Sequence, residues 1–382
     1  MLIGVDASRI TRRQRTGTEN YSLHVLRHLL QQDQRNAYRL YVNQPLPNGL
    51  LPCTDQVTER VIRMPRLWTQ LGLSAEMLRA QPDVLFVPSH VLPVISPPRS
   101  VVVVYDVGHR FFPRAHGILE WLYVEWATRR HVRIASALLT ISEASKRDIV
   151  RLYRADPSRI AVAYPAVDER FQPATQAEIA RVRSKHGLGL RYVLHLGTIK
   201  PRKNLPRLVR AFARADLPRD TQLILGGMTT IGAEAVERAI AETGLHDRVR
   251  RLAYVPDDDL PALYGGAACV ALVSLYEGFG MPALEALACG APVVAGNRGS
   301  IPEIVAEAGV IVDVLDTASI AAGLKQAVSD AATGARLRDL GPRRAQRFTW
   351  DDAARVTREV LERVARGAAP TEVPSPPPSV AS

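Results

Sequence analysis

The fold is indicated most clearly by one stretch, Val270-Ala271-Leu272-Val273-Ser274-Leu275-Tyr276-Glu277-Gly278-Phe279-Gly280-Met281-Pro282-Ala283-Leu284-Glu285-Ala286. Its first four residues form a short apolar run, as expected of a strand buried on both faces of a parallel sheet. The two glycines allow a tight turn, and Pro282 suits the first position of a helix. The stretch therefore predicts a strand, a turn and a helix, the arrangement in which open α/β sheets bind ligands.

Similar apolar runs alternate with helical patterns along the rest of the chain. We predict strands at residues 2–5, 40–42, 84–87, 101–104, 137–141, 160–163, 192–196, 222–225, 270–273, 292–295 and 310–312. Helical patterns lie at residues 20–30, 205–214, 233–243 and 320–329. This alternation predicts an α/β protein with two Rossmann-like, doubly wound parallel sheets, one in each half.

We expect four segments along the chain. The first is a Rossmann-like domain at residues 1–180 and the second a Rossmann-like domain at 181–345, with the boundary in a polar stretch between Phe171 and Gly189. Thr349 is a plausible N-cap for a helix within residues 346–366. Residues 367–382 carry four prolines near their end, and we predict a disordered tail.

Composition limits the class of protein. The 382 residues are 47% hydrophobic and 23% charged, which is typical of a globular chain, and the net charge is +11. This surplus favours acidic partners such as phosphates, anionic lipids or nucleic acid, although a charge that serves only solubility is an alternative. Three scattered cysteines indicate a reducing compartment. The opening residues resemble no signal peptide, and no run is long enough to span a membrane.

The quoted stretch also carries the first candidate site. A helix that starts at Met281 and Pro282 would point N–H groups and a positive dipole at an anion, most naturally a phosphate. Glu277 and Glu285 flank this position. A carboxylate beside a phosphate is favourable where it accepts hydrogen bonds from sugar hydroxyls. The alternative is that Glu277 is a solvated loop charge and Glu285 a partner of the helix dipole.

A second candidate segment follows the predicted strand at 192–196. Gly197 begins a turn that contains Lys200, Arg202 and Lys203 and opens a helix at Leu205. Lysine supplies a point charge and arginine a bidentate fork, so these side chains suit a diphosphate. A solvated basic turn is the alternative.

Together these segments resemble the retaining, nucleotide-sugar-dependent glycosyltransferases with two Rossmann-like domains facing across a cleft, the GT-B fold, and within them family 4, also called glycosyltransferase group 1. The resemblance extends from Met1 to about Arg363. It rests on two glutamates separated by seven residues, Glu277 and Glu285, and on the turn from Gly197 to Asn204. The segments at 142–146, 165–168 and 254–257 and the ending Phe348-Thr349-Trp350 match as well, the last resembling a helix that crosses back to the first domain.

The resemblance implies roles for particular residues. Glu277 would be catalytic and hold the hydroxyls of the transferred sugar, while Glu285 would hold the ribose. Lys203, also assigned as catalytic, and Arg202 would hold the diphosphate. The implied donor-binding set is completed by Gly197, Val255, which would meet the base through its backbone, Gly278, Phe279, Gly280 and Met281. Gly17, in the loop before the first helix, would lie near the donor diphosphate and the acceptor.

The chain departs from the family pattern at two positions. Thr198 follows the first glycine of the phosphate turn, where many relatives have Arg. Tyr105 stands where relatives carry a His that lines the reaction centre, and as a substrate-binding residue it can hydrogen-bond a sugar but is a poor base near neutral pH. Asp106 or His109 could accept the acceptor's proton, and a surface-loop role for His109 is equally open. The mechanism usually proposed for the family sends that proton to the leaving phosphate.

We expect no metal site and no cofactor other than the nucleotide-diphospho-sugar co-substrate, and we expect residues 257–259 to cap a helix. Residues 118–126 are interpreted as a core-packing helix of the first domain, and they are followed by Arg129, Arg130, His131 and Arg133. A bilayer surface is the alternative for this helix, because aromatic, aliphatic and basic side chains alternate there.

The resulting hypothesis is a metal-independent, retaining hexosyltransferase, with mannose as the candidate sugar, acting on a glycan or lipid-linked acceptor in surface polysaccharide synthesis. We expect a cytoplasmic protein, with peripheral contact at the inner face of the membrane as an option, and no nucleic-acid partner, since no recognition motif is present. The alternatives are a nucleotide-sugar epimerase or hydrolase, and a non-catalytic protein that binds glycan or nucleic acid.

Overall fold

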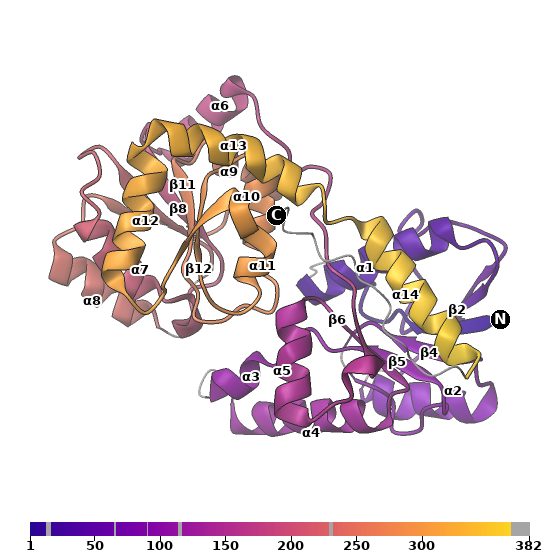
Figure 1. Ribbon diagram of the computed structural model, residues 1–382. Helices are drawn as coiled ribbons and strands as arrows, with labels where there is room; N and C mark the ends of the chain where they lie inside the picture. Colours follow the sequence, from indigo (N-terminus) through magenta and orange to yellow (C-terminus); the bar gives the residue numbers. More distant parts are fainter. Residues whose placement is uncertain (13–16, 65, 90, 114–116, 229–231, 368–382) are drawn as a thin grey trace. The chain divides into compact units, whose positions relative to one another are not determined.

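The computed structural model describes residues 1–12, 17–64, 66–89, 91–113, 117–228 and 232–367, and the chain forms two compact units (Figure 1). Within the described part, the first unit contains residues up to 110, 117–165 and 349–367. The second unit contains residues 111–113 and 166–348. The predicted tail lies outside the described residues, apart from Gly367.

The first unit is built on a seven-stranded parallel sheet in the order β3-β2-β1-β4-β5-β6-β7. Its strands are β1 (Leu2–Asp6), β2 (Ala37–Val42), β3 (Val57–Val61), β4 (Val84–Val87), β5 (Ser100–Val103), β6 (Ala137–Thr140) and β7 (Ile160–Val162). From β1 to β3 successive strands are added toward one edge of the sheet, and from β4 to β7 they are added toward the other edge, so the strand order reverses between β1 and β4. This is the doubly wound pattern, in which ligands bind beyond the carboxyl ends of the strands at the reversal.

The second unit repeats the pattern with a six-stranded parallel sheet in the order β10-β9-β8-β11-β12-β13. Its strands are β8 (Tyr192–Leu196), β9 (Gln222–Gly226), β10 (Val249–Leu252), β11 (Cys269–Leu272), β12 (Val293–Gly296) and β13 (Gly309–Val312). Here the reversal lies between β8 and β11. These neighbouring strands lead into the two segments that the sequence singled out, so the α/β prediction of two Rossmann-like sheets is confirmed.

Two strands were missed by the sequence patterns, and both lie at a sheet edge. Strand β3 has three exposed polar residues in its centre, Thr58, Glu59 and Arg60, and β10 contains Arg250 and Arg251. An edge strand has one neighbour and is partly solvated, so its residues need not form an apolar run.

The helices of the first unit are α1 (Gly17–Gln32), α2 (Ser74–Arg79), α4 (Ile118–Ile134), α5 (Glu143–Tyr153) and α14 (Trp350–Ala365), with α3 (Gly108–Phe111) at its limit. Helix α14 packs along α1, where the Trp350 ring stacks on His24 at 4.8 Å between centroids. Thr349 caps α14 as predicted, because its side chain accepts a hydrogen bond from Asp352 N at 3.1 Å.

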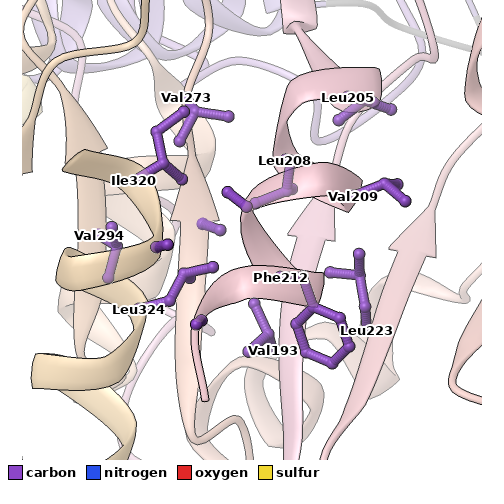
Figure 2. Close-up of a cluster of buried hydrophobic side chains, with 14 of the residues drawn as sticks. Val193, Leu205, Leu208, Val209, Phe212, Leu223, Val273, Val294, Ile320 and Leu324 are labelled. Carbon is purple, nitrogen blue, oxygen red and sulfur yellow. The ribbon is translucent and has the colours of Figure 1, made fainter. Parts of the chain in front are cut away.

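The second unit contains α6 (Gln176–His186), α7 (Leu205–Arg214), α8 (Ala233–Thr243), α9 (Leu260–Gly265), α10 (Met281–Ala288), α11 (Ile301–Val305), α12 (Thr317–Ser329) and α13 (Ala331–Ala345). Figure 2 shows α7 and α12 packed on the sheet through buried side chains such as Leu208, Phe212 and Ile320. This packing fixes the start of α7, and with it the basic turn that directly precedes the helix.

Residues 257–259 directly precede α9 as a short 3-10 turn, and Asp259 occupies the N-cap position of this helix as expected. Its side chain, however, makes no capping bond to α9. It is buried and instead pairs with α6, with Oδ2 at 2.6 Å from Lys185 Nζ and 2.9 Å from His186 Nε2. These hydrogen bonds, a further one from Arg181 and the charge of Lys185 outweigh the effect of burial and lower the pKa of Asp259 to about 2.

The interpretation of residues 118–126 as a core-packing stretch was wrong. In α4 the large apolar side chains of Ile118, Leu119 and Leu122 are exposed, whereas Glu125 and His131 are buried. Among the described helices, none is both long and apolar enough to cross a bilayer.

Candidate functional site

The basic turn and the glycine-rich turn lie side by side because β8 and β11 are hydrogen-bonded neighbours. The turn η4 (Pro201–Lys203) is joined to the loop after β11 by its backbone, since Leu275 N donates to Arg202 O at 2.8 Å. Asn204 Nδ2 adds a bond to Val273 O at 3.1 Å. The positions of the predicted phosphate-binding cations are thus fixed relative to the loop that carries Glu277.

Glu277 is the centre of this cluster. Lys203 Nζ lies 2.5 Å from Glu277 Oε1, and Arg202 Nη1 lies 2.5 Å from Oε2. Ser274 Oγ donates a further hydrogen bond to Oε1 at 2.7 Å. Burial alone would raise the pKa of Glu277, but the two cations and these hydrogen bonds outweigh it and lower the pKa to about 2. The carboxylate is therefore ionised at any pH near neutrality.

The three charged groups differ in exposure. The side chains of Lys203 and Glu277 are buried, whereas Arg202 is about one-third exposed, at 34%. Lys200 also belongs to the predicted basic group, but it is exposed at the start of η4. Of the predicted basic side chains, Arg202 and Lys203 therefore contact Glu277, whereas Lys200 does not.

The glycine-rich loop is fixed in shape. Gly280 has φ +98°, and a Cβ there would come within 2.4 Å of the Ile301 side chain, so only glycine fits. Ser300 Oγ donates to Phe279 O at 2.7 Å and lies 3.0 Å from Glu277 O. Helix α10 then begins at Met281, with Pro282 in its first turn as predicted. The N-terminal end of α10 therefore directly follows the Glu277 loop.

The Phe279 side chain is not available to a ligand in this structure. It is buried and meets the Phe348 ring edge-on at 5.9 Å between centroids. Gly278 is buried as well. A contact of either residue with a ligand would therefore be made by its backbone.

Glu285 lies one turn into α10, where its partner is Tyr264 of α9. Tyr264 Oη donates to Glu285 Oε2 at 2.7 Å. Burial raises the pKa of Glu285 to about 7, with the charge of Asp257 acting in the same direction and the Tyr264 bond opposing it. This carboxyl can therefore change its charge near neutral pH. Val255, the predicted base contact, is buried in the loop between β10 and η5 (Asp257–Asp259).

His195 is a further site residue that the sequence patterns did not identify. It is fully buried in β8, with Nδ1 2.9 Å from Ala271 O, so Nδ1 carries the hydrogen. Its Nε2 has no hydrogen-bond partner in the described structure. A Cβ placed on Gly197 (φ +145°) would lie 3.8 Å from this Nε2 and 3.5 Å from Lys203 Nζ.

Burial, assisted by the Lys203 charge, lowers the pKa of His195 to about 4, so the ring is neutral. A polar residue in the otherwise apolar run 192–196 was the available signal. Ser274 and Tyr264, which hold the two glutamates, gave no such signal.

The remaining predicted residues belong to the first unit. Gly17 is exposed at the start of α1. Tyr105 is buried, and its hydroxyl donates to Pro88 O at 2.6 Å, with Thr18 O at 3.1 Å. Burial raises the pKa of Tyr105, so it remains protonated. The Tyr105 hydroxyl is thus engaged by the loops around Gly17 and Pro88, which makes it a positioning group for the start of α1.

Asp106 and His109 differ in exposure. Asp106 is exposed and its Oδ1 accepts from Gly108 N at 2.7 Å. His109 is buried, which contradicts the surface-loop alternative. Its Nε2 lies 3.1 Å from both Glu125 Oε2 and Tyr153 Oη. Among the described residues, no group of three or more His, Cys, Asp or Glu side chains is arranged to hold a metal ion.

Comparison with known proteins gives the family. The family model described as "Glycosyl transferases group 1" matches residues 176–344. O-antigen chain mannosyltransferase B of Escherichia coli is 33% identical over 264 residues, which are 68% of this chain and 69% of that protein. MMP alpha-(1->4)-mannosyltransferase of Mycolicibacterium hassiacum is 34% identical over 248 residues, 63% of this chain and 57% of that protein.

Solved structures share the fold at low identity. Sucrose-phosphate synthase from Thermosynechococcus elongatus has a TM-score of 0.72 at 19% identity and covers 96% of this chain and 100% of its own. Anabaena Alr3699/HepE, solved in complex with UDP-glucose, has a TM-score of 0.68 at 19% identity, with 96% and 99% covered. The chain therefore belongs to the glycosyl transferases group 1 family and is a hexosyltransferase with the α/β architecture of the GT-B glycosyltransferases.

Proposed function

We propose that this protein transfers a hexosyl residue, specifically mannosyl, from a nucleotide-diphospho-sugar to a glycan or lipid-linked acceptor, with retention of anomeric configuration. The observation that carries the proposal is the cluster of Lys203, Arg202 and Glu277 beside the N-terminal end of α10. Mannose is proposed because two relatives are named mannosyltransferases. A nucleotide donor is supported by the UDP-glucose complex of a protein with the same fold.

The charges of the cluster suit an activated sugar. Two cations and one carboxylate leave a net charge of +1, which attracts a diphosphate. Arg202 and Lys203 would take the phosphate oxygens, aided by N–H groups around Gly280 and Met281. Glu277, once it shares its cations with phosphate, is free to accept hydrogen bonds from hydroxyls of the transferred sugar. Glu285 would accept those of the ribose.

The proposed reaction needs no enzyme nucleophile. The bond between the anomeric carbon and the phosphate oxygen breaks while the acceptor oxygen bonds to the same face of that carbon. The acceptor's proton passes to the leaving phosphate oxygen, whose negative charge Arg202 and Lys203 stabilise. Asp106 and His109 of the first unit stay candidates for assisting this proton transfer, and the acceptor is proposed to bind that unit near Gly17.

A panel of nucleotide sugars tests the function. A donor that binds the native state raises the melting temperature, and we expect GDP-mannose to give the largest shift. Incubation with this donor and glycan acceptors should yield a glycosylated product with the donor's anomeric configuration, measured by NMR. Donor consumption at the same rate without any acceptor would instead favour a hydrolase or epimerase. Binding without any turnover would favour a glycan-binding scaffold.

Transfer should not depend on a divalent cation, because Arg202 and Lys203 provide the positive charge that a metal would otherwise supply. We expect the initial rate after dialysis against EDTA to be unchanged. A rate abolished by EDTA and restored by Mg²⁺ would contradict metal independence.

Donor affinity should depend on pH through Glu285. Its carboxylate form accepts ribose hydroxyls better than the acid does, so affinity should fall as the pH drops below the pKa of about 7 and level off above it. At pH 6 the affinity should be about tenfold below the plateau. Calorimetry with the intact nucleotide sugar is suitable, because its diphosphate diester does not titrate in this range. Glu285→Gln should remove the pH dependence, and an unchanged profile in this variant would exclude Glu285 as its origin.

We also propose a cytoplasmic location and a role in surface polysaccharide synthesis. The named function of the O-antigen relative supports this proposal. Expression with a fluorescent tag followed by fractionation into cytosol and membrane tests the location.

A further inference from the structure

Helix α4 (Ile118–Ile134) has the reverse of the polarity expected for a surface helix. Three of its five buried residues are polar: Glu125, Thr128 and His131. Its exposed side is apolar instead. Ile118 and Leu119 are 75% and 78% exposed, and Leu122, Tyr123 and Trp126 are each about half exposed, at 51%, 48% and 48%. A surface helix normally turns such side chains toward the core, so this side is suited to an apolar environment.

The exposed residues form one continuous strip. At 3.6 residues per turn, positions 118, 119, 122, 123 and 126 share one side of the helix, and positions 129, 130 and 133 continue it. We call these eight residues the α4 face. Its first five residues are aliphatic or aromatic, and the other three are Arg129, Arg130 and Arg133, of which Arg130 is only partly exposed. The exposed carboxylate of the helix, Glu120, points to another side.

The α4 face continues onto two neighbouring segments. The Arg130 guanidinium donates to Pro93 O and Val94 O, each at 2.8 Å, and so fastens this loop to α4. Val94 and Ile95 are exposed there. Ile95 N donates in turn to Ser74 Oγ at the start of α2, next to the exposed Leu71. The apolar strip is therefore a broader surface of the first unit rather than a single helix side.

The charges favour a negatively charged partner. Arg133 is exposed, and the Arg130 guanidinium lies 5.9 Å from the Trp126 ring centroid. Arg129 is 63% exposed and pairs at 2.7 Å with Glu125, which is buried beneath the face and also contacts His109, Arg110 and Tyr153. Aliphatic side chains with Trp and Tyr, beside arginines on the same face, match a bilayer interface, where rings lie at headgroup level and guanidinium groups bind lipid phosphate.

We propose that the α4 face, with Val94, Ile95 and Leu71, docks the first unit on an anionic lipid bilayer. The role of this contact rests on the proposed function, because a membrane-bound enzyme can meet a lipid-linked acceptor in its bilayer. The docking itself does not require turnover. The surface extends beyond the helix and binds with its apolar side chains in the headgroup region and its exposed arginines, Arg129 and Arg133, against phosphates.

Vesicle sedimentation of the full chain tests the proposal. Wild type should bind POPC vesicles containing about 30% POPG at least about tenfold more tightly than POPC vesicles, with loss of binding at high salt. The triple variant Leu119→Ser, Leu122→Ser, Trp126→Ser should bind at least about tenfold more weakly. Arg133→Gln should weaken binding a few-fold to the anionic vesicles alone. All three side chains of the triple variant are exposed, and its melting temperature should equal that of wild type.

Matched controls lie in the second unit. Leu190→Ser and Leu315→Ser remove exposed leucines, and Arg219→Gln removes an exposed arginine. These variants should bind like wild type. Equal vesicle binding by the triple variant, or no binding by wild type, would overturn the proposal. The proposal would also be overturned if wild type sedimented as a dimer without binding lipid and the triple variant sedimented as a monomer. That result would assign the face to contact with a second copy.

Calorimetry with the nucleotide sugar separates this proposal from the proposed function. Donor affinity without vesicles should be the same in wild type and in the triple variant, because the Glu277 cluster belongs to the other unit. Vesicle binding without donor binding would contradict the proposed function alone, and donor binding without vesicle binding would contradict the docking surface alone.

Discussion

Glu277→Ala is expected to abolish sugar transfer, with kcat lowered on the order of 10³-fold. The carboxylate would hold hydroxyls of the transferred sugar, and it also holds Lys203 and Arg202 in place at 2.5 Å each. The substitution would therefore remove the hydrogen bonds to the sugar and the positioning of the two cations. Both act where charge develops in the transition state. Steady-state kinetics with the intact donor measures the change, and turnover near that of wild type would exclude Glu277 from the site.

This substitution should also destabilise the protein. It leaves the Lys203 ammonium buried without its partner, which typically costs about 3 kcal/mol. Glu277→Gln separates the two effects, because its amide oxygen can still accept from Lys203 and Ser274. This variant should unfold closer to wild type in urea and still be inactive. Glu242→Ala, which breaks an exposed pair with Arg210 in the same unit, should cost less than about 1 kcal/mol and leave turnover intact.

Lys203→Ala is expected to weaken donor binding by about 10- to 100-fold, since a charge-assisted bond of a buried ammonium to phosphate is lost. Calorimetry with the nucleotide sugar at fixed ionic strength measures this change.

Lys200→Ala is the matched control, because it removes a lysine of the same turn that is exposed. We expect its affinity to change less than about threefold. Equal loss in both variants would mean that the turn attracts phosphate only through its general charge. Unchanged affinity in Lys203→Ala would disprove the phosphate assignment.

Glu277 pairs with both cations of the cluster, so the buried Lys203 has a partner of opposite charge. Under the proposed function a donor phosphate would take over these two cations. The carboxylate would then accept hydrogen bonds from neutral hydroxyls of the sugar.

The sequence by itself determined the two sheets and the main site segments. Strands buried on both faces are mostly apolar along their length, so 84–87 and 192–196, the second interrupted by His195, stand out without any tertiary information. The turn chemistry of Gly280 and Pro282 is equally local, because a positive φ and a helix start each restrict the residue type. These restrictions also made the pair Glu277 and Glu285 recognisable.

The tertiary structure alone decided how the polar groups are paired and which faces are covered. Sequence could not tell that Lys203 and Arg202, but not Lys200, contact Glu277, because this depends on the pairing of β8 with β11. It could not place His195 Nε2 or bury His109 against Glu125. It also misjudged α4, since a helical pattern of apolar residues shows that one side is apolar but not whether that side faces the core. Burial is a property of the surroundings, and those surroundings are formed by residues far away in the chain.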